Sequence, residues 1–101
     1  MSDELLQWAR NVSMQAGLNA TLGCAKSFAT TDFRPDMAAF KVPTLIIHGT
    51  ADKTVPIDAA ERAAAKCIAG SVLIEYEEAP HGLFATHKAR LTKDLLTFLR
   101  E

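Results

Sequence analysis

The sequence has little of several features that would indicate particular functions. Its formal net charge is −1 over 101 residues, so no excess of basic side chains indicates binding to nucleic acid or to an anionic membrane. No apolar run approaches the roughly 20 residues that a membrane-spanning helix needs. The sequence also has no internal repeat, no low-complexity stretch and no Gly-rich phosphate loop. Its composition, 49% hydrophobic and 23% charged, is that of an ordinary globular protein.

Cysteine is scarce, and the two that are present do not indicate a metal or redox site. Cys24 and Cys67 are 43 residues apart, a spacing that fits neither class, and both are expected to be buried thiols. No cluster of His, Cys, Asp and Glu has the spacing of metal ligands. The start of the sequence, residues 1–4, is acidic rather than basic and so differs from a signal peptide, which predicts a cytoplasmic protein.

The first part of the chain has the pattern of two helices. Leu5, Trp8 and Val12 follow helical spacing, which predicts a helix from about Ser2 to Gly17. A second short helix is predicted from Asn19 onward, and a polar loop follows it. Most aromatic side chains are expected in a core or a pocket wall, namely Trp8, Phe28, Phe33 and Phe84.

Two stretches have the pattern of parallel strands. Residues 44–48 form a continuous apolar run that is expected to be covered on both faces, and residues 72–76 are predicted to form the second strand. The Ala-rich stretch 59–69 between them predicts a helix that ends at Gly70. Because a strand, a helix and a second strand in this order form a parallel unit, the fold class is predicted to be α/β with two adjacent parallel strands.

Polar residues are expected to start the later helices. Asp58 is predicted to cap the helix at 59–69, with Glu61 reaching back to complete the cap. Thr86 is predicted to cap a last helix, whose apolar stripe comprises Leu91, Leu95, Phe98 and Leu99. The predicted order is therefore two helices followed by strand, helix, strand and helix.

Each predicted strand leads into a loop with a residue suited to acid–base chemistry. Asp52 lies in the first loop and His81 in the second, and parallel strands bring such loops to one edge of the sheet. A carboxylate that holds an imidazole in one tautomer forms the acid–base pair of nucleophilic catalysis. The alternatives are that Asp52 is a turn former and His81 a surface histidine. His48, at the end of the first strand, is expected to pack structurally against the loop.

Three stretches resemble a known family. Residues 42–56 read VPTLIIHGTADKTVP and residues 79–82 read APHG, and together they resemble the C-terminal end of serine hydrolases with the α/β-hydrolase fold. The stretch TDFRPDM at 31–37 is similar to the cofactor-free (non-haem) haloperoxidase and aryl esterase group. The resemblance covers residues 30–101 as the C-terminal part of the hydrolase core. Residues 1–29 resemble, more weakly, a remnant of the helical cap.

The resemblance implies that Asp52 is the acid and His81 the base of a catalytic triad. The nucleophile of this family lies earlier in the chain, in a Gly-x-Ser-x-Gly elbow that this sequence lacks. Thr50 departs from the Asp or Asn that the family often has, which leaves the assignment of Asp52 intact. We therefore expect that the sequence begins after the elbow and that the isolated chain is inactive. None of its serines has the elbow context, whether Ser2, Ser13, Ser27 or Ser71.

The implied reaction is acyl transfer from a small ester to water, and in some relatives to hydrogen peroxide, without a metal or organic cofactor. The alternatives are an inactive, self-associating interaction module and a truncated product without function. In the family sheet, the strand at 44–48 has a further neighbour that this sequence lacks. We therefore expect a homodimer, formed through this strand edge or by exchange of the N-terminal helices.

Overall fold

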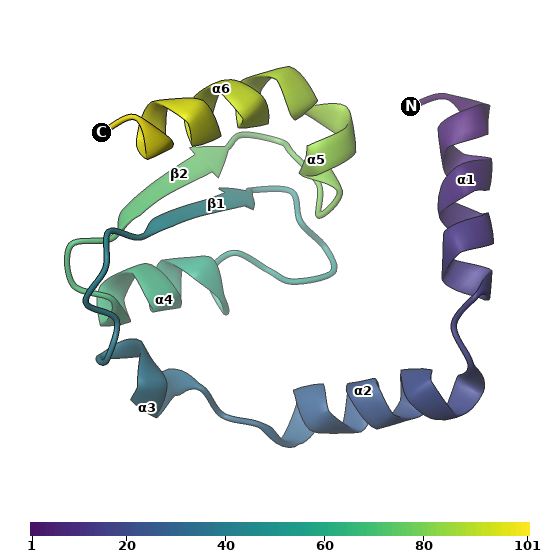
Figure 1. The fold of residues 1–101 in the computed structure, drawn as a ribbon, viewed down its shortest axis with the longest axis horizontal. Helices are drawn as coiled ribbons and strands as arrows, with labels where there is room; N and C mark the ends of the chain where they lie inside the picture. The colour runs from purple at the N-terminus through teal and green to yellow at the C-terminus, as the bar shows by residue number, and fades with distance from the viewer. The chain divides into compact units, whose positions relative to one another are not determined.

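The computed structural model describes residues 1–101, which form six helices and two strands (Figure 1). The chain divides into two compact units, Met1–Phe33 and Arg34–Glu101. None of the helices is long and apolar enough to cross a membrane.

The first unit contains two helices, α1 (Asp3–Met14) and α2 (Leu18–Thr30). The Ser2 hydroxyl caps α1 by accepting a hydrogen bond from the Leu5 backbone N–H at 3.1 Å. Gly17 is the last residue of the segment that connects the two helices and is the N-cap of α2, which has no side-chain cap. Both predicted helices are present, and α2 begins one residue before the expected Asn19.

Neither helix of the first unit buries a residue. Trp8 is 59% exposed and Phe28 is 82% exposed, so the expectation that they lie in a core or pocket wall is wrong for this structure. Phe33 and Phe84 are exposed as well. The prediction of two buried thiols is also wrong, because Cys24 in α2 and Cys67 in the second unit are both exposed.

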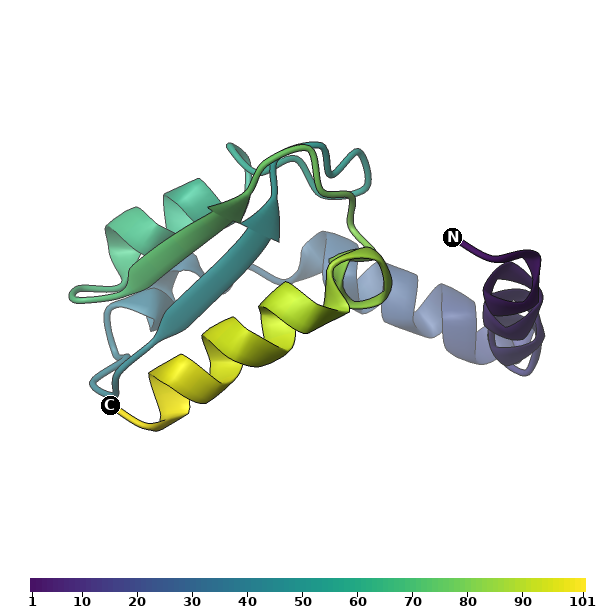
Figure 2. The same ribbon diagram turned by 90° about the horizontal axis from the view of Figure 1, so that it is seen from above.

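The second unit is built around a parallel sheet of two strands, β1 (Leu45–Gly49) and β2 (Val72–Tyr76). The strands pair in register from Leu45 opposite Val72 to Gly49 opposite Tyr76, which confirms the predicted parallel neighbours. Helix α4 (Glu61–Cys67) connects the strands along the chain. Figures 1 and 2 show α4 on one face of the sheet and α6 (Lys88–Leu99) on the other. The short helices are α3 (Arg34–Met37) and α5 (Leu83–Thr86).

A buried tyrosine joins the end of β2 to helix α6. Tyr76 is fully buried, its hydroxyl donates a hydrogen bond to Asp94 Oδ2 at 2.5 Å, and the Arg90 guanidinium lies 3.9 Å from its ring centre. Burial, together with this bond to a carboxylate, raises the pKa of Tyr76 to about 12. The end of β2 is thereby held in place where the chain turns towards His81.

Two predicted helix caps are wrong. Helix α4 begins at Glu61 with Ala60 at the N-cap and no side-chain cap. Asp58 instead accepts a hydrogen bond from Arg62, because a guanidinium is a stronger partner for a carboxylate than a backbone N–H. Helix α6 begins at Lys88, after the short helix α5, and its N-cap is His87 rather than Thr86.

Candidate active site

The loops that follow the two strands are bonded to each other at one edge of the sheet. The Thr50 backbone N–H donates to the Tyr76 carbonyl at 3.0 Å, and the Ala51 N–H donates to the Ala79 carbonyl at 3.0 Å. The Glu78 N–H donates to the Thr50 hydroxyl at 2.8 Å. Glu78 has a φ of 59°, in the left-handed region that turns the second loop back towards the first. The Thr50 side chain therefore helps to join the loops.

Gly49 allows this close approach. A Cβ atom at this position would lie 2.1 Å from the Ala79 carbonyl oxygen and 2.9 Å from the Pro80 carbonyl oxygen. Both are backbone atoms, so no side chain can rotate away to make room. The sequence analysis did not assign a role to Gly49. A glycine directly after a buried strand was the available signal, since such a position often marks a close backbone contact.

The joined loops bring Asp52 and His81 together. The Asp52 Oδ2 atom lies 2.8 Å from the His81 Nδ1 atom, which confirms the predicted hydrogen-bond distance. The Asp52 side chain is 3% exposed, whereas the His81 side chain is 57% exposed. The Nε2 atom, on the opposite side of the ring from Asp52, thus belongs to an imidazole that solvent and other groups can reach.

The other oxygen of Asp52 is held by the backbone of its own loop. The Oδ1 atom accepts hydrogen bonds from the N–H groups of Thr54 at 2.9 Å and Val55 at 2.8 Å. Burial alone would raise the pKa of Asp52, but these two bonds and the bond to His81 outweigh it and lower the pKa below its usual range. Asp52 is therefore a carboxylate at neutral pH, which is the form that can orient an imidazole.

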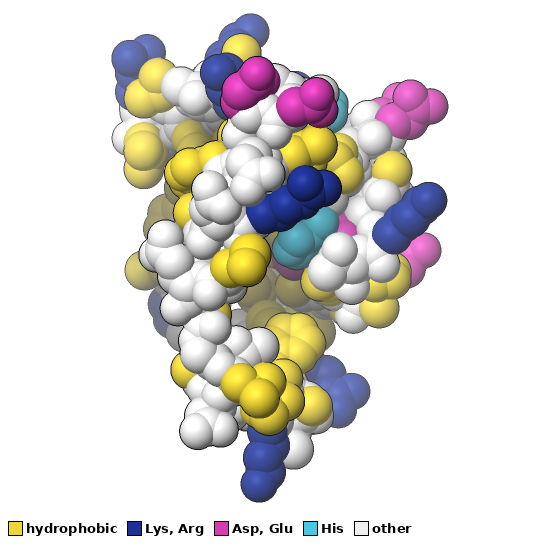
Figure 3. Space-filling view, turned by 90° about the vertical axis from the view of Figure 1, so that its right-hand side faces the viewer, with side chains coloured by type: hydrophobic (Ala, Val, Ile, Leu, Met, Phe, Trp, Pro, Cys, Tyr) yellow, Lys and Arg dark blue, Asp and Glu magenta, His cyan; other side chains and the backbone are white.

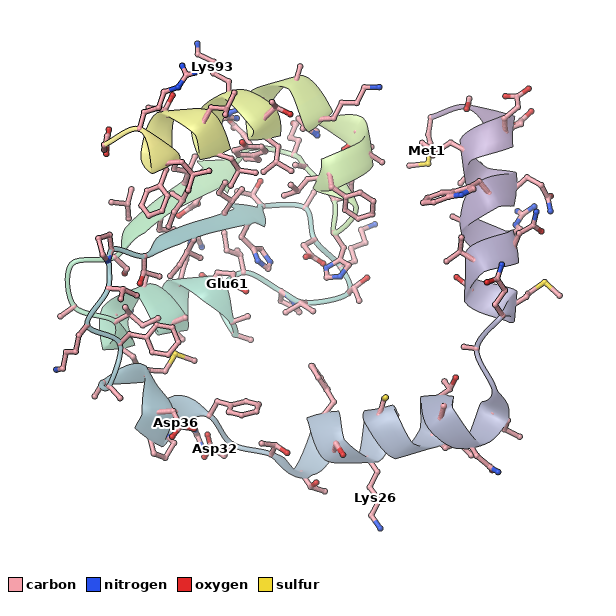
Figure 4. All side chains as sticks on the ribbon, viewed as in Figure 1. Met1, Lys26, Asp32, Asp36, Glu61 and Lys93 are labelled. Carbon is pink, nitrogen blue, oxygen red and sulfur yellow. The ribbon has the colours of Figure 1, made fainter.

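Two further side chains belong to the same site. The buried His48 has its Nε2 atom 2.7 Å from the Val55 carbonyl oxygen and 3.2 Å from Asp52 Oδ2. Its Nδ1 atom lies 3.5 Å from Glu61 Oε1 at the start of α4, below the end of β1 in Figure 4. With Asp52 and His81, these residues line a cavity of about 250 Å³. The expectation that His48 packs against the loop is confirmed, whereas the contact with Glu61 was not foreseen.

The bonded Asp52 and His81 side chains have no serine beside them in the second unit. Ser71 is the only serine of residues 34–101, and it precedes β2, whereas His81 follows that strand. Ser71 and His81 therefore lie at opposite ends of β2, which has five residues at about 3.3 Å each. No group of three or more His, Cys, Asp and Glu side chains could hold a metal ion.

Adjacent parallel strands that bring an aspartate and a histidine to one edge of the sheet are a feature of the α/β-hydrolase class. The comparison with protein families agrees with this, because the sequence profile of the TAP-like protein family of α/β-hydrolases matches residues 10–101. The chain belongs to this family.

Curated relatives and solved structures give the same class. The chain is 39% identical over 87 residues to a non-heme chloroperoxidase of Streptomyces lividans, which covers 86% of the chain and 32% of that protein. It is 34% identical over 96 residues to the bifunctional esterase/perhydrolase DCH of Acinetobacter calcoaceticus, with coverage of 95% and 34%. The chain spans about a third of the length of these relatives.

Two solved structures match along the whole chain. A bromoperoxidase from Bacillus anthracis has a TM-score of 0.96 at 36% identity, and an esterase from Exiguobacterium antarcticum has a TM-score of 0.93 at 32% identity. Each match covers 100% of this chain and 37% of the other. The predicted fold class and the resemblance to haloperoxidases and esterases are therefore confirmed.

Proposed function

We propose that this chain supplies the acid and the base of a serine ester hydrolase whose nucleophile lies in polypeptide outside these 101 residues. The observation that carries the proposal is the bond between the Asp52 carboxylate and His81 Nδ1 at the edge where both strands end. A buried carboxylate behind an exposed imidazole is the arrangement that a general base needs.

In the proposed mechanism, Asp52 holds His81 with its proton on Nδ1, which leaves Nε2 free to accept a proton. Nε2 takes the proton of the serine hydroxyl as the serine oxygen attacks the ester carbonyl. The resulting imidazolium, stabilised by Asp52, then protonates the departing alcohol. In the second half, His81 takes a proton from water as the water attacks the acyl-enzyme, and it returns that proton to the serine oxygen as the acid is released.

We also propose that hydrogen peroxide can replace water in the second half. Attack of peroxide on the acyl-enzyme would release a peracid and regenerate the serine, with the same proton transfers through His81. The supporting observation is the 34% identity to a bifunctional esterase/perhydrolase over 95% of this chain. The substrate class is a small ester in both cases.

The proposal predicts that the 101-residue chain alone does not hydrolyse esters. The protein encoded by the complete open reading frame that contains this sequence is expected to hydrolyse them. The reason is that removal of one triad member lowers the rate of serine hydrolases by about 10⁴- to 10⁶-fold. Both proteins are assayed with a short-chain activated ester and treated with a serine-directed phosphonate. A phosphonate adduct on a serine of the short chain, or an inactive complete protein, would contradict the proposal.

A second candidate function is self-association, which the open edge of β1 favours. The Thr44 carbonyl and the Thr50 N–H bond to β2, so the backbone groups of the alternate residues Leu45 and Ile47 point away from β2. A two-stranded sheet is rarely stable by itself, and an unpaired strand edge readily pairs with another chain. Figure 3 shows hydrophobic side chains at the surface of the face in view, and most of the large hydrophobic side chains of α1 and α2 are exposed. We propose a homodimer through β1 edges or exchanged N-terminal helices.

Sedimentation equilibrium over a tenfold range of concentration is expected to show a concentration-dependent dimer. If the β1 edges pair, Ile47→Pro should dissociate it, because proline removes an N–H that points away from β2 and leaves the bonds between β1 and β2 intact. Ile46→Pro is the matched control and should unfold the chain, since the Ile46 backbone faces β2. A folded monomer at every concentration would contradict the dimer, and a dimer that survives Ile47→Pro would favour helix exchange.

A further inference from the structure

We propose that His48 is a positioning residue of this site, which holds the Asp52 carboxylate and limits how strongly that carboxylate acts on His81. The inference deepens the proposed function, on which its effect on catalysis rests. The contacts that carry it all lie within residues 48–81.

The protonated nitrogen of His48 can be assigned from its partners. His48 is 6% exposed, and its Nε2 atom lies 2.7 Å from the Val55 carbonyl oxygen. Because a carbonyl oxygen only accepts hydrogen bonds, the hydrogen must be on Nε2. The same nitrogen lies 3.2 Å from Asp52 Oδ2, the oxygen that is bonded to His81. One carboxylate oxygen therefore faces two N–H groups, one from each imidazole.

The contacts of His48 also fix the position of the carboxylate. Val55 accepts from His48 through its carbonyl and donates to Asp52 Oδ1 through its N–H at 2.8 Å. His48, Val55 and Asp52 thus form a closed ring of contacts in which both carboxylate oxygens are held. A carboxylate oriented in this way presents Oδ2 to His81 without rotating.

The charged groups around His48 are few. Glu61 of α4 faces Nδ1 at 3.5 Å, and Asp52 faces Nε2. Glu75 is the register partner of His48 on β2, but Arg62 binds its carboxylate through two nitrogens, at 2.6 and 3.1 Å. His48 is therefore held between two carboxylates, and the assignment of the hydrogen to Nε2 applies whether or not Nδ1 is also protonated.

The two possible roles of His48 change the titration of His81 in opposite directions. If Nε2–H draws negative charge away from Asp52, its removal leaves Asp52 acting more strongly on His81, so the protonated form of His81 becomes more stable and its titration midpoint rises. Loss of the support that His48 gives to Asp52 acts in the opposite direction, but the Thr54 and Val55 N–H groups still hold Oδ1 in its absence, so the rise is expected to dominate. If His48 acted only as a support, the midpoint would fall, as it would without the carboxylate.

The test is an NMR titration of His81 in the 101-residue chain and three variants. His48→Asn, whose amide is too short to reach Val55, should raise the midpoint by about 0.5 to 1 pH unit. His48→Gln, which can place an N–H near the original Nε2 position, should stay within about 0.2 units of the unmodified chain. Asp52→Asn should lower the midpoint. In the complete hydrolase, the acidic limb of the kcat/KM profile should move with the His48→Asn shift while KM is unchanged.

An unchanged or lowered midpoint in His48→Asn would overturn the role of His48. If Asp52→Asn also fails to lower the midpoint, the acid–base pair and the proposed function fail with it, so the two failures are distinguishable. If His48→Asn does not fold, the inference can still be tested on the unmodified chain. The ¹⁵N signals of the unmodified chain should show a protonated His48 Nε2 from about pH 5 to pH 8, and a bare Nε2 would refute the inference.

Discussion

Replacing His81 by alanine in the complete hydrolase is expected to lower kcat for a short-chain ester by about 10⁴- to 10⁶-fold. His81 presents one nitrogen to the Asp52 carboxylate at 2.8 Å, and only the opposite nitrogen of the same ring can serve a nucleophile. Without the imidazole, the serine keeps its proton and the leaving alcohol receives none. Steady-state kinetics with an activated aryl ester measures the loss.

The matched control for this variant is His87→Ala. His87 lies in the same unit, between α5 and α6, and its Nδ1 atom contacts the Thr86 hydroxyl at 2.7 Å rather than a carboxylate. This variant should keep most of the activity. Asp52→Asn should lower kcat by about 10⁴-fold, because the amide no longer selects the tautomer with the proton on Nδ1. A His81→Ala enzyme within tenfold of the unmodified one would rule out His81 as the base.

Replacing Gly49 by alanine is expected to disrupt both the fold of the second unit and the site. The added Cβ would lie 2.1 Å from the Ala79 carbonyl oxygen, so the loop that carries His81 must move away from the loop that carries Asp52. Such overpacking against the backbone costs on the order of 3 kcal/mol. The urea midpoint of unfolding should fall, and the bond between Asp52 and His81 should be lost in the fraction that remains folded.

Gly82→Ala is the control for Gly49→Ala. Gly82 lies in the same loop as His81, has a φ of −80° that alanine adopts readily, and has no atom within 4 Å of the added Cβ. This variant should unfold at nearly the same urea concentration as the unmodified chain, with the His81 signals unchanged. If Gly49→Ala behaves in the same way, the close approach of the loops does not hold the site together.

The local pattern of the sequence was sufficient for the elements that form the sheet. The continuous apolar run of β1, the β-branched and aromatic residues of β2 and the Ala-rich stretch between them predicted two parallel strands, because strands that alternate with a helix form parallel units. The proximity of Asp52 and His81 followed from the same pattern, since parallel strands end at one edge of the sheet. That they act as acid and base remains a proposal.

The tertiary structure alone decided the features that depend on partners distant in sequence. Asp58 had the local signal of a helix cap, yet its carboxylate binds Arg62 instead. The same guanidinium also binds Glu75 of β2, and no local pattern could predict that the fold brings Glu75 to Arg62. The exposure of Cys24 and Trp8 has the same origin, because burial requires a packing partner and neither helix of the first unit buries a residue.

The sequence by itself determined the order of the strands and of the longer helices α1, α2, α4 and α6, and the two residues at the sheet edge, because periodicity is a local property. The short helices α3 and α5 were not predicted. The close contact at Gly49, the placement of His48 between Asp52 and Glu61, and the joining of the two loops by Thr50 appeared only in the folded chain. Each of these depends on a backbone carbonyl, an N–H or a charge that the fold brings within about 3.5 Å, and such contacts leave no periodic signal in the sequence.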